Sequence, residues 1–392
     1  MNKGIITSLL ALALTAAATS AQAVPAFARK YDADCGKCHN AFPQLNTAGR
    51  KFKEAGYRFP KLKGEETISD FLQFDEYFPA SAIFVSRPYD KKDNGDDKVR
   101  AIHELELMVA GRFYKNVSGF FEMEAEDEDT NSRGFEVGIP AAWLTYTYSD
   151  AIKAQATWGE LLATDPYDTY AGGRRLTRGT QAVIDKSFGG ADDGGKLGDS
   201  RQSLSIFGRP IKQLFYSVGY GGNADDSEGV NPNTLYGRLA WDVMPNIMIG
   251  ALYVDGECED CMVDPADPEE DRDYTRYGVD AQADIGDARV MGVWLTAEDD
   301  DPTGNDDEEN DAWYLQGEYV FKQDGRPTIV PLVRVDSWQE DDGNDDFKTV
   351  TLNLGYYFTQ NIKGYIEYWN EFDTPSDHND DSRLTVQIVA GF

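Results

Sequence analysis

The stretch Val350–Phe358 reads VTLNLGYYF, with a large apolar side chain at every second position and polar or small residues between them. Side chains of a β-strand point alternately to its two faces, so this pattern predicts a strand with one apolar face. The same alternation recurs in Leu235–Val243 and Leu384–Phe392. Because residues 79–392 show such runs and no long helical period, this region is predicted to be all-β.

About sixteen alternating runs can be placed, and an even number of antiparallel strands is typical of bacterial outer-membrane barrels. The predicted strands are residues 79–88, 99–114, 118–127, 135–148, 152–160, 201–208, 212–221, 234–243, 246–255, 274–285, 287–297, 311–321, 327–338, 347–358, 361–370 and 382–392.

The connectors between these runs alternate between two classes. Short connectors are residues 115–117, 149–151, 244–246, 286, 322–325 and 359–360. Longer, acidic connectors are residues 90–97, 127–134, 224–231, 257–273, 298–310, 340–346 and 373–381. Short turns at one end and long loops at the other predict an outer-membrane β-barrel. A soluble β-sandwich would also alternate, but it would not sort its connectors by length and charge.

Two further features fit a barrel. Aromatic residues near strand ends are expected to form interfacial girdles, and the chain ends on a strand whose last residue is Phe392. The girdle candidates are Phe113, Tyr148, Tyr274, Phe321, Tyr357 and Phe358.

The longest connector, Leu161–Ser200, is rich in glycine, aspartate and arginine. It is compatible with an extracellular loop or with a loop folded into the lumen. Its cluster Arg174, Arg175 and Arg178 would line a constriction in the second case, although a solvated loop is the simpler expectation.

The chain carries 37 basic and 69 acidic residues, a net charge of −32, which disfavours nucleic acid and favours cations as partners. Met1–Ala23 resembles a secretory signal: Lys3 precedes an apolar run, and Ala21-Gln22-Ala23 fits a cleavage site, so Val24 is the expected mature N-terminus. No later stretch approaches the roughly 18 to 20 apolar residues of a spanning helix.

The motif Cys35-Gly36-Lys37-Cys38-His39 is the attachment signature of one covalently bound haem c. Two thiols three residues apart meet the two vinyl groups, and His39 supplies the proximal axial nitrogen. The alternative is a disulfide followed by an unrelated histidine. The predicted organisation is a signal peptide at 1–23, a monohaem cytochrome c segment at 24–64, a linker at 65–78 and the barrel at 79–392.

Within the haem segment, the sequence from Phe42 to Tyr57 predicts an amphipathic helix of about three turns. Its apolar face would contain Leu45, Ala48, Phe52 and Ala55. About 40 residues cannot bury a core of their own. A barrel of this size leaves an aqueous interior, so the segment is expected to plug the lumen.

The order of signal, single Cys35-x-x-Cys38-His39, the block from Phe42-Pro43 to Gly56-Tyr57, and a barrel resembles the fused cytochrome-porin outer-membrane proteins of iron-oxidising bacteria. The resemblance covers the chain as architecture and residues 25–60 as motif. It implies that the haem takes electrons from extracellular Fe(II) and passes them to a periplasmic cytochrome or other carrier. The functional residues that the resemblance implies for this chain are Cys35, Cys38 and His39.

A second axial ligand must come from the barrel or be absent, because residues 24–64 contain no methionine and no other histidine. The candidates are Met108, His103 and His378. Strand parity directs Met108 to the lumen, whereas His103 shares the lipid-facing parity and needs a bulge to turn inward. His378 lies in an acidic loop and is expected to be solvated.

The same parity directs five carboxylates to one lumen wall: Glu104, Glu106, Glu122, Glu124 and Glu126. Oxygen ligands suit weakly bound Fe(II), and an acidic lumen concentrates cations. Polar walls are also expected in any porin, so a cation path stays one of two interpretations. Cys258 and Cys261 fall in an external loop, where a disulfide is expected.

The expected function is electron transfer at the bacterial outer membrane, with Fe(II) oxidation as the possible enzymatic activity and both termini periplasmic. Two alternatives stay open: a haem-bearing porin for small solutes or cations, and a surface cytochrome with another donor.

Overall fold

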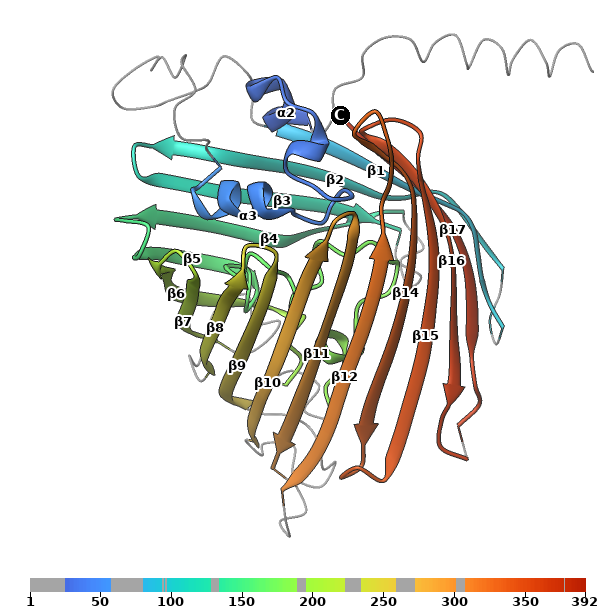
Figure 1. Ribbon diagram of the computed structural model, residues 1–392. Helices are drawn as coiled ribbons and strands as arrows, with labels where there is room; N and C mark the ends of the chain where they lie inside the picture. The colour runs from blue at the N-terminus through green and yellow to red at the C-terminus, as the bar shows by residue number, and fades with distance from the viewer. Residues whose placement is uncertain are drawn as a thin grey trace, which may run out of the picture.

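The computed structural model describes residues 25–57, 80–93, 95, 97–127, 134–188, 195–222, 234–258, 272–300, 307–376 and 378–392. Its main feature is one antiparallel sheet that closes on itself, because β1 pairs with both β2 and β17 (Figure 1). β13 continues β12 after Val320, and both pair with β14, so the two segments act as one strand. The 17 strand segments therefore form a closed barrel of 16 strands.

The strands are β1 Ala80–Lys92, β2 Lys98–Tyr114, β3 Val117–Glu126, β4 Glu136–Thr147, β5 Lys153–Glu160, β6 Ser200–Ile211, β7 Leu214–Gly221, β8 Thr234–Met244, β9 Ile247–Cys258, β10 Arg272–Ile285, β11 Ala288–Asp299, β12 Glu308–Tyr319, β13 Phe321–Gln323, β14 Arg326–Glu340, β15 Asp345–Tyr357, β16 Ile362–Asp373 and β17 Ser382–Gly391. The predicted sixteen-stranded antiparallel barrel is therefore confirmed.

The alternation that predicted the strands separates the two faces of the wall. In β15, Thr349, Thr351 and Asn353 are buried on the inner face, whereas Leu352 and Leu354 are about half exposed on the outer face. Polar side chains inside and apolar ones outside are the arrangement of a barrel that meets lipid. Among the described residues, no helix is long and apolar enough to cross a membrane.

The aromatic girdle holds only in part. Phe113, Tyr148, Phe321 and Phe358 are exposed on the outer surface. Tyr274 and Tyr357 are buried, so for these two residues the prediction is wrong. Both face inward because their hydroxyl groups have partners there: Tyr274 accepts from Arg201, and Tyr357 donates to the carbonyl of Phe42.

The N-terminal segment contains α2 Pro25–Tyr31, the 3₁₀ turn η2 Cys35–Lys37 and α3 Thr47–Glu54. The expected three-turn helix is shorter, because the Asn46 side chain caps its N-terminus by accepting from the amides of Ala48 and Gly49. Leu45 therefore precedes the helix, and Ala55 follows it.

This segment lies at the barrel end that carries the short turns and the C-terminus (Figure 1). It is held by inward-facing side chains of the wall: Glu54 pairs with Arg209 at 2.7 Å, and Arg50 pairs with Asp284 at 3.4 Å. Gln44 donates to Glu318 at 3.2 Å. These buried contacts place the segment inside the mouth rather than beside it.

The connector between β5 and β6 folds into the lumen, so the expectation of a solvated loop is wrong. This lumen loop, residues 161–188 and 195–199, includes the short helix α4 Ala182–Asp185, and most of these residues are buried. Its backbone and side chains bond to inward-facing residues of the wall, including Tyr314, which donates to the Thr169 carbonyl at 2.8 Å. Each such bond gives a buried polar group a hydrogen-bond partner, which it would otherwise need from water.

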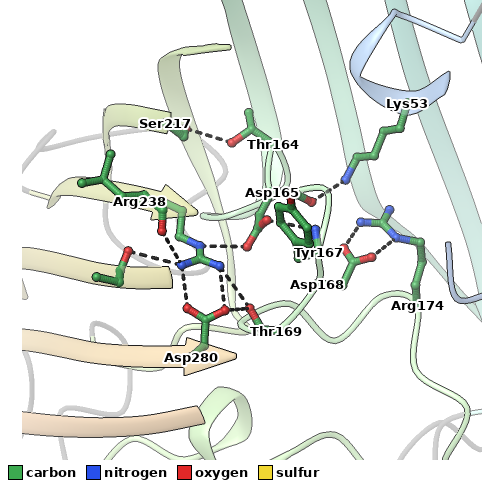
Figure 2. A network of polar contacts seen from close by, with 12 residues as sticks. Lys53, Thr164, Asp165, Tyr167, Asp168, Thr169, Arg174, Ser217, Arg238 and Asp280 are labelled. Carbon is green, nitrogen blue, oxygen red and sulfur yellow. Dashed lines mark hydrogen bonds and ion pairs between the residues drawn. The ribbon is translucent and has the colours of Figure 1, made fainter. Parts of the chain in front are cut away.

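A network of polar contacts anchors the loop to the wall (Figure 2). Arg238 of β8 donates to Asp165 at 3.0 Å and to both carboxylate oxygens of Asp280, at 2.7 and 2.8 Å. Thr169 donates to the same Asp280 at 2.7 Å. The loop is thereby tied to β8 and β10 by charge-assisted hydrogen bonds.

Candidate haem site

A cavity of about 600 Å³ lies between the N-terminal segment, the lumen loop and the wall formed by the first strands. Both motif cysteines, His39, Met108 and the five predicted glutamates all lie on its lining. The structure thus brings together residues that are up to 91 positions apart, Cys35 to Glu126.

The Cys35–His39 motif forms a tight turn. The amides of Cys38 and His39 both donate to the Cys35 carbonyl, at 3.0 and 2.9 Å, and the two thiols are not joined in a disulfide. Gln360, in a short turn of the wall, accepts from the Cys35 amide at 3.0 Å. Burial raises the pKa of the Cys38 thiol. The turn presents to the cavity two thiols that are not joined in a disulfide, which thioether attachment requires.

The His39 ring is oriented by backbone. Its Nδ1 lies 3.0 Å from the Pro43 carbonyl oxygen and 3.3 Å from that of Gln44. Because both neighbours are acceptors, Nδ1–H donates, and Nε2 is the nitrogen that is available to ligate a metal. Burial lowers the pKa of His39 to about 4. A neutral imidazole with its far nitrogen fixed by a carbonyl is the form that ligates haem iron.

Close packing between α3 and the motif depends on Gly49. A Cβ at this position would lie 2.1 Å from the Cys38 carbonyl oxygen. Only glycine lets the helix backbone approach the turn this closely. The sequence does not predict this role of Gly49, because the position of a residue within a helix does not show which other segment its backbone will approach.

The cavity suits a large, mainly apolar cofactor with charged edges. Its volume falls within the ~300–1,000 Å³ range of ligand pockets, and its apolar lining includes Phe27, Tyr31, Phe52, Phe120 and Trp143. Phe52 packs edge-on against Phe27 at 5.0 Å between ring centroids. The thiol pair, the oriented imidazole and this lining fit a c-type haem.

Of the three candidate distal ligands, all within the described part of the chain, Met108 alone lies on the cavity wall. His103 does turn inward through a break in alternation: three residues of β2 stand opposite Ser86 of β1, and Ala101 and Ile102 are both exposed. Its buried ring, however, meets Glu126 at 3.0 Å and Asp127. It therefore belongs to an ion cluster rather than to the cavity.

His378 lies in the last long loop, where its Nε2 is 3.1 Å from Glu371. Its side chain is 39 % exposed, which agrees with the expected solvated position.

The five glutamates form a ladder on β2 and β3, called here the acidic ladder. Strand register places Glu104 opposite Glu126, Glu106 opposite Glu124, and Met108 opposite Glu122. Because β2 begins at the long-loop end, the rungs run in this order from that end toward Met108. Among the described residues, no three carboxylate, thiol or imidazole groups converge tightly enough to hold a metal ion.

Basic side chains lie on the same cavity. Arg174, Arg175 and Arg178 of the lumen loop reach it, together with Lys363 of β16. Arg174 pairs with Asp168, and Arg178 pairs with Asp90 at 3.1 Å. The alternation Lys363, Tyr365, Glu367 would have identified Lys363 as inward-facing. No sequence signal placed the loop arginines beside the motif.

The remaining predictions fall outside the described residues. These are the signal peptide and its cleavage site, the linker at 65–78, and the side chains of Cys258 and Cys261.

No protein-family model and no curated protein matches this chain. Solved structures do. OmpT, an outer membrane protein of Vibrio cholerae, in its trimer form, aligns with TM-score 0.60 at 11% identity, covering 80% of this chain and 98% of that one. Salmonella typhi OmpF in complex with daunomycin aligns with TM-score 0.59 at 14% identity, covering 82% and 98%.

An anion-selective porin from Comamonas acidovorans aligns with TM-score 0.57 at 11% identity, covering 80% of this chain and 98% of that chain. At these identities the likeness shows the fold alone. The chain has the porin-like fold of outer-membrane β-barrels.

Proposed function

We propose that this protein is an outer-membrane electron-transfer protein that oxidises extracellular Fe(II) and delivers the electrons to a periplasmic cytochrome or another periplasmic carrier. The observation that carries the proposal is one cavity lined by Cys35, Cys38 and His39 and also by the acidic ladder. A haem held there supplies a one-electron acceptor between an outer donor and an inner carrier.

The proposed orientation follows from the connectors. Outer-membrane barrels have short turns on the periplasmic side and long loops outside. The N-terminal segment lies among the short turns, so both ends of the barrel sequence face the periplasm. The outer apolar wall contacts lipid, and the long loops face the donor.

In this proposal the acidic ladder guides the donor. Its two outer rungs are carboxylate pairs, and a wall of one charge sign raises the local concentration of counter-ions. Carboxylate oxygens bind Fe(II) weakly, which favours passage over retention. Met108, beside the innermost rung, is the proposed second axial ligand.

A diffusion channel is the second candidate, supported by the likeness to solved porins. Its weakness is the lumen: the N-terminal segment occupies the short-turn mouth, and the lumen loop crosses the interior. An open channel predicts steady ion conductance in planar bilayers, whereas the electron-transfer proposal predicts little.

The test uses the full-length protein purified in detergent after covalent haem has been confirmed by denaturing gel and absorption. Oxidised protein is mixed with Fe(II) near neutral pH in a stopped-flow spectrometer. We expect stoichiometric reduction of the haem, lost in His39→Ala and kept in His378→Ala, a matched histidine in an outer loop. Reduction by dithionite but not by Fe(II) would eliminate iron as the donor. Absence of covalent haem would eliminate the proposal as a whole.

A further inference from the structure

Among the described residues, four cations on the cavity form no ion pair with a carboxylate: Lys53, Arg87, Arg175 and Lys363. Arg175 donates through Nε to the Arg178 carbonyl at 3.1 Å and through Nη1 to the Gly172 carbonyl at 3.0 Å. Lys363 donates to the Phe42 carbonyl at 3.1 Å. Elsewhere in the lumen buried cations are paired with acids, as Arg238 and Arg276 are. Backbone bonds orient Arg175 and Lys363, and the acids that act on their charges, Glu160 and Glu106 respectively, do so without forming an ion pair.

Both cations lie close to the haem-binding turn. Lys363 lies 5.6 Å from the Phe42 ring centroid, and that ring meets the His39 ring edge-on at 5.2 Å. Leu176, next to Arg175, is buried in one apolar cluster with Ala41 and Phe42. The lumen loop thus brings Arg175 from one side and the wall brings Lys363 from another, around the residues that follow His39.

Another part of the cavity wall, on β2 and β3, is acidic. The acidic ladder lines it, and a cofactor carrying carboxylates would be repelled from that side. A haem has an apolar ring and two carboxylates on one edge. The bonds to Cys35, Cys38 and His39 would hold the ring, and cations would stabilise that edge. Arginine matches a carboxylate with a rigid fork of donors, and lysine adds a second, compact charge.

We propose that Arg175 and Lys363 bind the two propionate carboxylates of the haem and so fix the position of its charged edge. This inference rests on the proposed haem site but not on the identity of the donor. Two positive charges would then meet two negative charges. The lumen loop then has a second role beyond closing the barrel: it supplies one half of a cofactor clamp.

The test compares reduction potentials of the full-length haem protein, measured by optical redox titration. Removing positive charge beside a haem favours its oxidised form, so Arg175→Gln combined with Lys363→Gln is expected to lower the potential. We expect a change near tenfold in the electron-transfer equilibrium constant, which is 59 mV for one electron. Arg175→Lys should retain much of the wild-type value. Lys186→Gln is the matched control, since Lys186 belongs to the same loop but lies over Trp338.

Resonance Raman spectra give a second readout, because propionate bending modes report hydrogen bonding to the carboxylates. A shift of these modes in the double variant, absent in Lys186→Gln, supports the clamp. Unchanged potential and unchanged modes in a double variant with full haem content overturn it. If the double variant folds but its haem no longer occupies the pocket, the Arg175→Lys variant decides. A wild-type haem spectrum in Arg175→Lys supports the clamp, and a spectrum like that of the double variant overturns it. Wild-type protein without covalent haem would refute the proposed site itself, a distinct outcome.

Discussion

The lumen has two unlike halves. Along β8–β12 it is filled by the lumen loop, and its charges are paired: Arg238 lies 2.7 Å from Asp280, and Arg276 lies 2.8 Å from Asp299, with these side chains fully buried. Along β2 and β3 there is a cavity, and carboxylates stand opposite carboxylates, as Glu106 does to Glu124.

The difference separates structural from functional charge. Like charges directly opposite each other in a sheet cost about 0.2–1 kcal/mol per pair. A protein gains nothing in stability from such a wall, whereas the paired half holds the loop in place. We infer that short buried ion pairs mark where the lumen is scaffold, and charged groups without such pairs mark where a ligand would bind.

The largest effect is expected from breaking the paired half. Arg238→Ala leaves Asp165 and Asp280 buried without their cation, and loss of one partner of a buried pair costs roughly 3–5 kcal/mol. The free energy of unfolding of detergent-folded protein in guanidinium measures this. Arg326→Ala is the control, since its pair with Asp34 spans 3.5 Å with both side chains exposed, and should cost about 0–1 kcal/mol. Equal stability of the two variants would show that the network does not hold the loop.

A smaller effect is expected where the N-terminal segment borders the cavity. Gly49→Ala places a methyl group against the Cys38 carbonyl, so we expect a loss of about 1–3 kcal/mol from overpacking and faster proteolysis of residues 25–57. Helix propensity alone predicts the reverse, a gain near 1 kcal/mol. The sign of the change therefore decides the matter. Gly36→Ala is the control, because the nearest atom there lies at an ordinary 3.6 Å.

The smallest change in stability, and the most informative about function, is expected from the acidic ladder. Glu106→Gln with Glu124→Gln should raise the free energy of unfolding by about 0.2–1 kcal/mol. The same variant should slow haem reduction by Fe(II) roughly tenfold at low ionic strength, and less in salt, because steering is screened. Glu309→Gln, an exposed acid outside the cavity, should leave both unchanged. An unaltered rate in the double variant would refute guidance by the ladder.

Strand parity predicted the barrel and one cavity wall because both depend on local alternation. Thr351 and Leu352 face opposite sides in the structure as in the sequence, and the same logic placed Met108 and the glutamates. It failed at His103, where three residues of one strand face a single residue of the next. The position of Arg175 was also beyond prediction, because a long loop is placed by distant partners such as Arg238 and Tyr314. Helix α3 is shorter than the periodicity predicted, because Asn46 caps its N-terminus. Asn46 is a local signal for a helix start, and the prediction gave more weight to the apolar period.

The junction of β17 with β1 joins the two ends of the barrel sequence, and the amides and carbonyls of Ala82 and Phe392 bond reciprocally at 2.9 Å. Until that junction forms, β1 keeps an unpaired edge. The native contacts of the N-terminal segment also depend on distant residues, because its anchors Asp284, Gln360 and Lys363 come from the second half of the chain. Such distant contacts form slowly. These anchors of residues 25–57 therefore lie 234 or more positions further along the chain, so the segment reaches its native place only when both ends of the barrel sequence have come together.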